Sequence, residues 1–496
     1  MMDRSFLRPG RIFALFAILV WTVMMGALIK KTYLPSPGLG SAWRVGSGEG
    51  IEAGETWMGI YLNDRKIGYA VSRWEKEDLD WRVVERVVME LVVMGRPQPV
   101  RISTSTLLDP SCQLKSFHFH LSAGETEFGA EGQAAGRGKD LVVRLSGLGE
   151  DKEVRIRGRQ GPLLWANLRF LFRNRSLREG DRIQVSLLDP ATLQVEGVEL
   201  GVEGRERIKV GEKEIEAFRL KANFKGIVVR SWIDEKGEIW KEESPLGFTL
   251  VREDKETALL KGRGTGRAED LLALAAVSSP VRFADPGSIS VLRLRLVNLP
   301  GPGFDLDGGR QRLRDGTLEI RREEFDFTAP TLPLRSAKLL PYLEATPFIQ
   351  TGHPELRAQA LAVLQGEVNA LAAARKLAAW VYENIEKRPT LSFPSALEVL
   401  HRRVGDCNEH TTLYAGLARS VGLPTKIAAG LIYQKGRFYY HAWPEVFVGR
   451  WVAIDPTLNQ FPADATHIRL VEGGLERQAE LIKLMGSLSL DILGYR

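Results

Sequence analysis

The chain has 496 residues, 44% of them hydrophobic, which is enough for about three domains of ordinary size. Its 68 lysines and arginines nearly balance 62 aspartates and glutamates, giving a formal net charge of +6, and the two signs alternate along the sequence without a basic stripe. This distribution argues against a nucleic-acid partner, and the presence of only two cysteines argues against a disulfide framework.

The N-terminal region contains an uncharged, mostly apolar run at residues 12–29, between Arg11 and Lys30. At about 1.5 Å per residue, a helix of this length spans most of a hydrocarbon core about 30 Å thick. A cleaved signal peptide is the alternative, but the small residues before Leu28 form a poor cleavage site. Residues 1–34 are therefore predicted to be a transmembrane anchor. Basic residues balance across the run, so charge alone does not set its orientation.

A Gly- and Pro-rich linker is predicted at residues 35–56, followed by short β-prone runs over residues 57–266. One helical interruption falls at residues 163–172. This pattern predicts a β-rich domain, a curved antiparallel sheet around a helix, which loosely resembles the lipoprotein-carrier kind. Such a domain would act as a spacer or bind a protein partner, or alternatively bind an apolar ligand.

Three features outside the predicted catalytic domain are interpreted as structural. Cys112 has neither a helix start nor a local base, and is predicted to be buried packing. His118 and His120 share one strand face at a spacing that suits a metal, but lack a further ligand nearby. The acidic fragment at residues 305–308 lacks the later glutamate of an EF-hand and is predicted to be a turn. Neither a metal nor a cofactor is predicted.

The C-terminal half is predicted to mix helices with strands, so the fold class is multidomain α+β. Residues 267–330 are expected to form a connector and a small β module, and residues 331–470 a catalytic domain. The latter begins with helical patterns at residues 354–386 and 395–403. Residues 471–496 are predicted to form a C-terminal helix.

Cys407 opens the next predicted helix. From Asn408 apolar residues recur every three to four positions until a Gly-Leu-Pro stop at 422–424, and Asp406 is the predicted N-cap. Free N–H groups and the positive end of the helix dipole favour thiolate over thiol there, and could hold an oxyanion. A cysteine at a helix start is more often structural, so a catalytic interpretation depends on the residues downstream.

His441 and Asp455 lie in two extended segments that are typical of a β-hairpin. A two-residue loop would place them on opposite faces of the hairpin. A three-residue loop at 448–450, or a bulge near Pro444, would place them on one face, with Trp443 across from Asp455. The three-residue loop is predicted, because its central glycine supplies the left-handed conformation required.

Together, Cys407, His441 and Asp455 have the composition of a thiol nucleophile, its general base and the group that orients the base. His410 is the alternative base, since it shares a helix face with Cys407, but no carboxylate partner for it is evident. Glu409 and Glu445 could tune the site electrostatically, but they are predicted to be surface residues.

Four sequence blocks in this order resemble the transglutaminase-like superfamily, in its bacterial branch related to microbial cysteine peptidases and peptide N-glycanases. They are Gly405-Asp406-Cys407 before a helix, Gly422-Leu423-Pro424 before a strand, His441-Ala442-Trp443, and Trp451 followed by Asp455-Pro456-Thr457. The resemblance covers roughly residues 340–470. It implies a papain-like α+β core with Cys407 as nucleophile, His441 as base and Asp455 as orienting residue, and with Trp443 and Trp451 lining the site.

The residues and the resemblance together predict a thiol enzyme that acts on amide bonds of protein or peptide substrates through a thioacyl intermediate. Water as the second nucleophile would make it a peptidase or amidase, and an amine would make it an acyltransferase. A catalytically silent scaffold that binds a partner is the alternative. By similarity to anchored bacterial relatives, the chain is expected to be a single-pass protein of the bacterial inner membrane, with its bulk periplasmic and its substrate in the cell envelope.

Overall fold

The computed structural model describes residues 52–124, 126–135, 140–157, 162–172, 177–224, 227–244, 247–260, 269–299, 301, 303–390 and 395–496. The predicted anchor, at residues 1–34, and most of the predicted linker lie outside the described residues. Within the described part of the chain, no helix combines the length and the apolar character needed to cross a bilayer.

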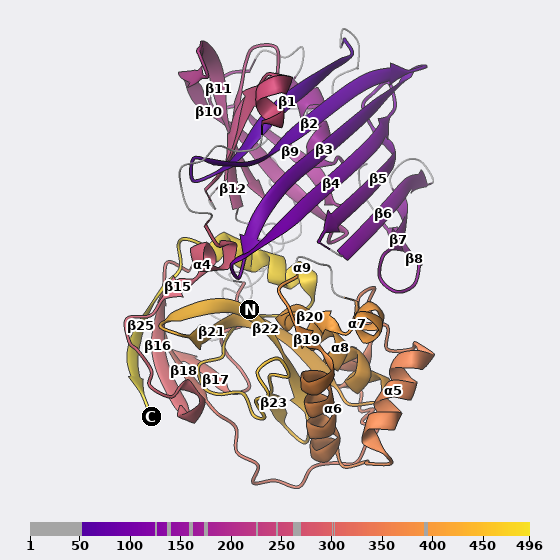
Figure 1. The fold of residues 1–496 in the computed structure, drawn as a ribbon, viewed down its shortest axis with the longest axis vertical. Coiled ribbons are helices and arrows are strands. Elements are labelled where there is room, and N and C mark those ends of the chain that lie inside the picture. The colour runs from indigo at the N-terminus through magenta and orange to yellow at the C-terminus, as the bar shows by residue number, and fades with distance from the viewer. Residues whose placement is uncertain are drawn as a thin grey trace, which may run out of the picture.

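Fourteen antiparallel strands form one continuous curved sheet, which occupies the upper part of Figure 1. Its order runs from β8 back to β1 and then from β14 back to β9, so two meanders meet where β1 pairs with β14. The predicted β-rich, antiparallel character of this half is confirmed. The strands are β1 Gly54–Leu62, β2 Arg65–Glu77, β3 Asp80–Val93, β4 Arg96–Leu108, β5 Leu114–Ala123, β6 Thr126–Ala135, β7 Asp140–Ser146, β8 Lys152–Ile156, β9 Arg182–Asp189, β10 Gln194–Val210, β11 Lys213–Phe224, β12 Ile227–Ile233, β13 Ile239–Glu243 and β14 Phe248–Glu253.

The predicted helical interruption is present as η1 (Trp165–Asn167) and α2 (Arg169–Phe172). Leu171 packs there against strands β9 to β12. Cys112 is 1% exposed in the core of the other meander, and burial, followed by the charge of Asp109, raises the pKa of Cys112 to about 11. Cys112 is therefore packing, as predicted, and His118 and His120 are exposed on β5.

A four-stranded sheet in the order β17, β18, β16 and β25 follows, and it corrects the predicted C-terminal helix. Only α9 (Leu475–Gln478) and η4 (Ala479–Leu484) are helical, and β25 (Ser489–Tyr495) instead pairs with β16 (Val291–Val297). The reason is that Leu488, Leu490 and Ile492 alternate with other residues at the strand period of two and join one apolar cluster with β16. The remaining strands are β17 Gln311–Arg314 and β18 Thr317–Arg321.

The third unit packs helices against a five-stranded sheet, in the lower part of Figure 1. The helical pattern predicted at 354–386 is two helices, because Gln365 adopts a left-handed conformation (φ 52°) and Asn369 caps a new helix. The helices are α5 Pro354–Leu364, α6 Ala370–Asn384, α7 Ala396–Arg402 and α8 Cys407–Ser420. The strands are β15 Val277–Ser278, β21 Thr425–Gln434, β22 Arg437–Phe447, β23 Trp451–Ala453 and β24 Ile468–Glu472. Short elements elsewhere are α3 Lys255–Leu259, which contacts β1 and β2 of the large sheet, α4 Leu271–Ala275, η2 Pro286–Ser288, η3 Leu340–Leu343, β19 Glu386–Lys387 and β20 Val404–Gly405.

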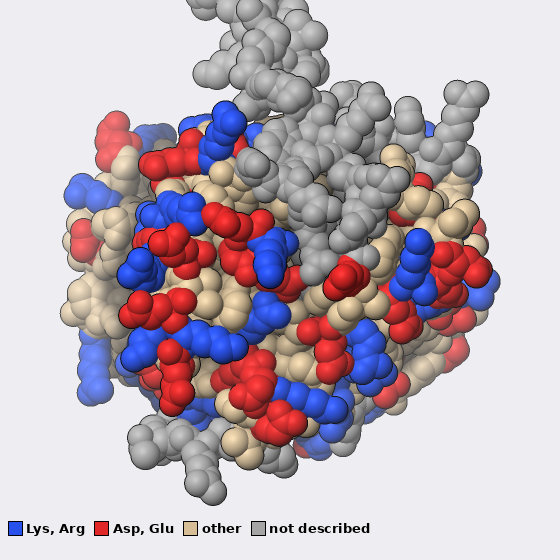
Figure 2. All heavy atoms as spheres, turned by 90° about the horizontal axis from the view of Figure 1, so that it is seen from above, with Lys and Arg blue, Asp and Glu red and all other residues tan. Residues whose placement is uncertain are grey.

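The large sheet contacts this helical unit through the turn after β7. The carbonyl oxygen of Leu148 accepts hydrogen bonds from Ser395 Oγ and, at 3.2 Å, from Gln350 Nε2, and all three residues are buried. Gly149 has φ +87°, and an added Cβ would lie 3.0 Å from Leu397 on α7. The contact thus fixes the start of the helix that leads to Cys407. On the face shown in Figure 2, basic and acidic side chains are interleaved, as they are in the sequence.

Candidate active site

Cys407 is the first residue of α8, and the capping of this helix fixes its place. Asp406 is the N-cap and accepts a hydrogen bond from the Asn408 backbone N–H at 3.0 Å, while Glu409 Oε2 accepts one from the Asp406 N–H at 2.8 Å. Glu409 is only 4% exposed, so its predicted surface position is wrong. Thr411, one turn further on, donates to the carbonyl of Ala442 at 3.1 Å and ties the helix to β22.

The Cys407 thiol is half-buried and interacts with the backbone N–H of Ala442 on β22. Burial raises the pKa of Cys407 well above its usual value, the charge of Asp406 raises it further, and only the Ala442 N–H lowers it. The direction of this shift is opposite to the one expected from the helix end, because burial and the nearby carboxylates both raise the pKa of Cys407. A thiol with a raised pKa holds its proton more tightly than a free cysteine does.

Strands β22 and β23 form the predicted hairpin with the predicted three-residue loop. Phe447 pairs with Trp451, which leaves residues 448–450 as the loop, and the central glycine has φ +111°. In this register His441 and Asp455 lie on one face. His441 Nε2 is 2.7 Å from Asp455 Oδ2, so the loop brings the two side chains together as predicted.

Asp455 is 0% exposed and accepts four hydrogen bonds. Its Oδ2 faces the Nε2 atoms of His441, at 2.7 Å, and of His467, at 3.1 Å, and its Oδ1 accepts from the backbone N–H groups of Thr457 and Leu458 at 2.8 and 3.1 Å. Burial by itself would raise the pKa of Asp455, but His441 and then His467 hold it far below its usual value. An ionised carboxylate only accepts hydrogen bonds, so His441 Nε2 carries a proton, which leaves Nδ1 as the unprotonated nitrogen of a neutral imidazole.

His467 and Asp464 complete this group, and the sequence analysis missed both. His467 is 1% exposed, and its Nδ1 lies 3.2 Å from Asp464 Oδ1. Burial lowers the pKa of His467, but hydrogen bonds and charges from Asp455 and Asp464 raise it to about 9. The one available signal was the three-residue spacing from Asp464 to His467, which no motif distinguishes. We call Asp455, His441, His467 and Asp464 the Asp455 cluster.

Three atoms of the Asp455 cluster also have a spacing that suits a metal ion, since His441, Asp455 and His467 each offer a ligand atom within 4.8 Å of the others. The Nε2 atoms of His441 and His467, however, already face the same oxygen, Asp455 Oδ2. The positive charge of His467 also offsets the negative charge of Asp455. The residues therefore fit a hydrogen-bonded cluster at least as well, and the prediction of no metal remains a prediction.

The two tryptophans predicted to line the site lie in different surroundings. Trp443 is 0% exposed, with its ring centroid 6.3 Å from that of His441 at an interplanar angle of 21°. Trp451 is partly exposed, stands edge-on to Tyr342 at 4.9 Å, and has Lys426 Nζ 4.4 Å from its ring centroid. Trp443 thus supports the His441 ring from beneath, and roles in substrate binding stay predictions for both residues.

The alternative base, His410, is turned into its own helix. It is 0% exposed, its Nδ1 lies 2.7 Å from the Asp406 carbonyl oxygen, and burial lowers its pKa. A neutral imidazole bonded to a backbone carbonyl lacks the carboxylate that orients a base, which His441 has.

A buried ion pair lies on the same sheet. Arg469 Nη1 contacts both carboxylate oxygens of Glu445, at 3.1 and 3.0 Å, and both residues are under 5% exposed, so the predicted surface position of Glu445 is wrong. The Arg469 guanidinium also donates to the carbonyls of Asp305 and Gly308, at 3.0 and 3.1 Å. The acidic fragment at 305–308 is an irregular segment that leads into the turn at 308–311, and its carbonyl oxygens accept hydrogen bonds from the arginine.

Residues 357–456, which include Cys407, His441 and Asp455, match the family model of the transglutaminase-like superfamily. The chain contains a transglutaminase-like domain. A search of the curated proteins finds no match. Among solved structures the chain is similar to a protein of Cytophaga hutchinsonii, provisionally named a cysteine protease, at 16% identity over 42% of this chain and 87% of that one, with a TM-score of 0.27. The assignment of the domain follows from the family match alone.

Two open clefts border the transglutaminase-like domain. One of about 740 Å³ lies between the β21–β22 turn and the segment around η2, and Asp464 and His467 form part of its wall. Another of about 580 Å³ lies between the large sheet and the domain, beside Tyr342 and Lys426. Both volumes are in the range of ligand sites, roughly 300–1,000 Å³. Cys407 is not among the residues that line either cleft.

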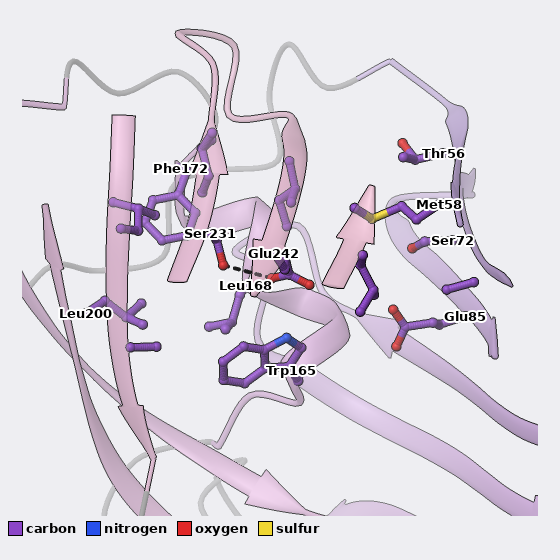
Figure 3. Close-up of a pocket in the computed structure, with 16 residues that line it drawn as sticks. Thr56, Met58, Ser72, Glu85, Trp165, Leu168, Phe172, Leu200, Ser231 and Glu242 are labelled. Atoms are coloured by element: carbon purple, nitrogen blue, oxygen red, sulfur yellow. Dashed lines mark hydrogen bonds between the residues drawn. The ribbon is translucent and has the colours of Figure 1, made fainter. Parts of the chain in front are cut away.

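A smaller pocket of about 60 Å³ lies inside the large sheet, where strands from both meanders face Trp165 and Leu168 (Figure 3). Ser231 Oγ donates to Glu242 Oε1 at 2.8 Å on one of its walls. The pocket is far below the usual size of a ligand site, so an apolar-ligand role for the large sheet stays a prediction.

Proposed function

We propose that this protein is a cysteine-dependent enzyme that cleaves amide bonds or transfers their acyl groups. The observation that carries the proposal is the 2.7 Å contact of His441 Nε2 with a fully buried, ionised Asp455, on a strand whose next residue, Ala442, touches the Cys407 thiol. Nucleophilic catalysis by cysteine needs an imidazole of fixed tautomer near the thiol, and the contact of Cys407 with the residue that follows His441 supports that arrangement.

In the first half-reaction, His441 Nδ1 takes the proton of the Cys407 thiol while the sulfur bonds to the amide carbonyl carbon. Because burial raises the pKa of the Cys407 thiol, proton transfer to His441 accompanies the attack in this proposal. The carbonyl electrons move to oxygen, where the free backbone N–H groups at the start of α8 stabilise them. The C–N bond then breaks, the amine leaves with the proton from His441, and a thioester remains on Cys407.

The second nucleophile completes the reaction. Water gives a free acid and an amine gives a new amide, with His441 accepting the proton of the nucleophile in either case. We further propose that the substrates are proteins or peptides of the bacterial cell envelope. The apolar run at residues 12–29 supports this proposal, because it would anchor the chain in the inner membrane with its bulk outside the cytoplasm.

The test is to trap the thioester. Full-length protein is incubated with an envelope extract, quenched in acid and digested, and the peptide of Cys407 is analysed by mass spectrometry. We expect an acyl adduct that hydroxylamine releases as a hydroxamate. The adduct should be lost in Cys407→Ala and strongly reduced in His441→Gln, and the peptide of Cys112 should carry none. With excess methylamine, a transferase would yield the methylamide and a hydrolase the free acid.

A negative result also has a defined meaning. If no adduct forms and iodoacetamide alkylates Cys407 equally fast in the wild type and in His441→Gln, the histidine does not activate the thiol. The catalytic proposal then fails, and a scaffold that retains the fold for partner binding is what remains.

A further inference from the structure

We propose that His467 is a positioning residue that works as a fixed cation, which together with Asp464 holds Asp455 in place and limits how strongly that carboxylate acts on His441. The inference deepens the proposed function, since it concerns the same thiol site. It assigns a role to the buried, charged pair of His467 and Asp464, which has no part in the mechanism proposed above.

The geometry defines both ends of the pair. His467 is the residue before β24, and its two ring nitrogens each face a carboxylate oxygen, at 3.1 Å for Asp455 and 3.2 Å for Asp464. Asp464 is itself fixed, because its Oδ1 accepts from the Thr466 backbone N–H and its Oδ2 from Gln460 Nε2, both at 2.8 Å. An ionised carboxylate only accepts hydrogen bonds, so both imidazole nitrogens must carry protons. His467 is therefore an imidazolium.

The net charge of the Asp455 cluster changes by one unit during the reaction. At rest Asp455 and Asp464 contribute two negative charges and His467 one positive charge. When His441 takes the thiol proton, the cluster becomes neutral. His467, whose ring centroid is 6.1 Å from that of His441, opposes this protonation and so keeps His441 able to release the proton to the leaving amine.

The other charged groups around the cluster are already paired. Arg310 donates to the carbonyl oxygens of Ala463 and Asp464, both at 2.9 Å, and lies 3.6 Å from the carboxylate of Glu323. Arg469 pairs with Glu445 on the neighbouring strand. The indole of Trp443 stands edge-on to His467 at 5.2 Å and adds no formal charge. The fixed cation that faces Asp455 is thus His467.

The first test observes the charge directly, without a substrate or a reactive thiol. Full-length protein with ring-¹³C-labelled histidine gives signals from seven residues, and His467 is assigned by its loss in His467→Gln. We expect the His467 signals to remain those of an imidazolium at pH 7.5 and to titrate near pH 9. In Asp464→Asn the same signals should titrate at lower pH, because one carboxylate is gone. Neutral-imidazole signals at pH 7.5 in the wild type would overturn the inference.

The second test measures what the charge does to the site. The rate of Cys407 alkylation by iodoacetamide is recorded against pH for the wild type, His467→Gln and Asp464→Asn, with His118→Gln as the exposed control. Without the cation, His441 binds its proton more tightly and the thiol loses a stabilising charge. The half-maximal rate should move up by about one pH unit in His467→Gln. It should move less in Asp464→Asn and not at all in the control.

The outcomes separate this inference from the proposed function. If His467 is charged and the pH profile of Cys407 alkylation shifts in His467→Gln, the inference and the proposed function are both supported. A charged His467 with an unchanged profile in a folded His467→Gln protein overturns the positioning role alone. If thermal unfolding shows that His467→Gln does not fold, the profile of Asp464→Asn decides, because that change touches neither Asp455 nor His441.

Discussion

Replacing Asp455 by asparagine should disable the base without removing it. The amide oxygen can still accept the backbone N–H groups of Thr457 and Leu458, but the amide nitrogen then faces the N–H donors of His441 and His467. His441 relieves this clash by moving its proton to Nδ1. That nitrogen can then no longer accept the proton of the Cys407 thiol.

The size of the effect follows from the contact that is lost. With Nε2 and Oδ2 at 2.7 Å, the centres of the two charges lie about 4 Å apart, so their attraction is about 4 kcal/mol at an effective dielectric constant of about 20. At about 1.4 kcal/mol per decade this corresponds to roughly a thousandfold in the population of protonated His441. Since direct ionisation of the thiol adds a slow background, we expect alkylation of Cys407 at pH 7.5 to fall by about a hundredfold to a thousandfold.

The assay is iodoacetamide alkylation followed by mass spectrometry of the Cys407 and Cys112 peptides. The buried Cys112 thiol, with its pKa raised to about 11, reports any general loss of structure. Asp326→Asn is the matched control, because Asp326 is exposed and lies 2.8 Å from Arg450 in a surface pair. A rate within threefold of the wild type, in an Asp455→Asn protein of unchanged unfolding temperature, would refute the argument.

Three further outcomes concern stability. The pKa of His467 is raised from 6.5 to about 9, so the charged ring should add at most about 3 kcal/mol to the free energy of unfolding. This contribution should be complete below pH 6.5 and lost as the pH rises through 9. Urea unfolding at several pH values should show this loss of stability in the wild type and not in His467→Gln. Arg469→Met leaves Glu445 buried without its partner and should cost about 3–5 kcal/mol in the free energy of unfolding, measured by the same method. Gly149→Ala should uncouple the large sheet from α7 and split the calorimetric transition, whereas Gly180→Ala, at a similar positive φ but with nothing within 4 Å, should only lower the unfolding temperature slightly.

Local sequence determined much of the site. The cap at Asp406 and the apolar periodicity that follows specify a helix beginning at Cys407, because both signals act within a few residues. The register of the hairpin was also set locally, since one glycine in a three-residue loop decides which faces His441 and Asp455 share. These features follow from chain geometry over short distances.

Only the tertiary structure decided the rest. The C-terminal strand β25 pairs with β16, almost two hundred residues earlier in the chain, and no local pattern selects such a partner. The pKa of Cys407 is raised because the fold buries its thiol near carboxylates, an effect opposite in direction to the helix dipole that the sequence predicts. His467 meets Asp455 because the chain returns along the sheet edge. Protonation depends on every charge within several ångströms, and those neighbours exist only once distant segments have packed together.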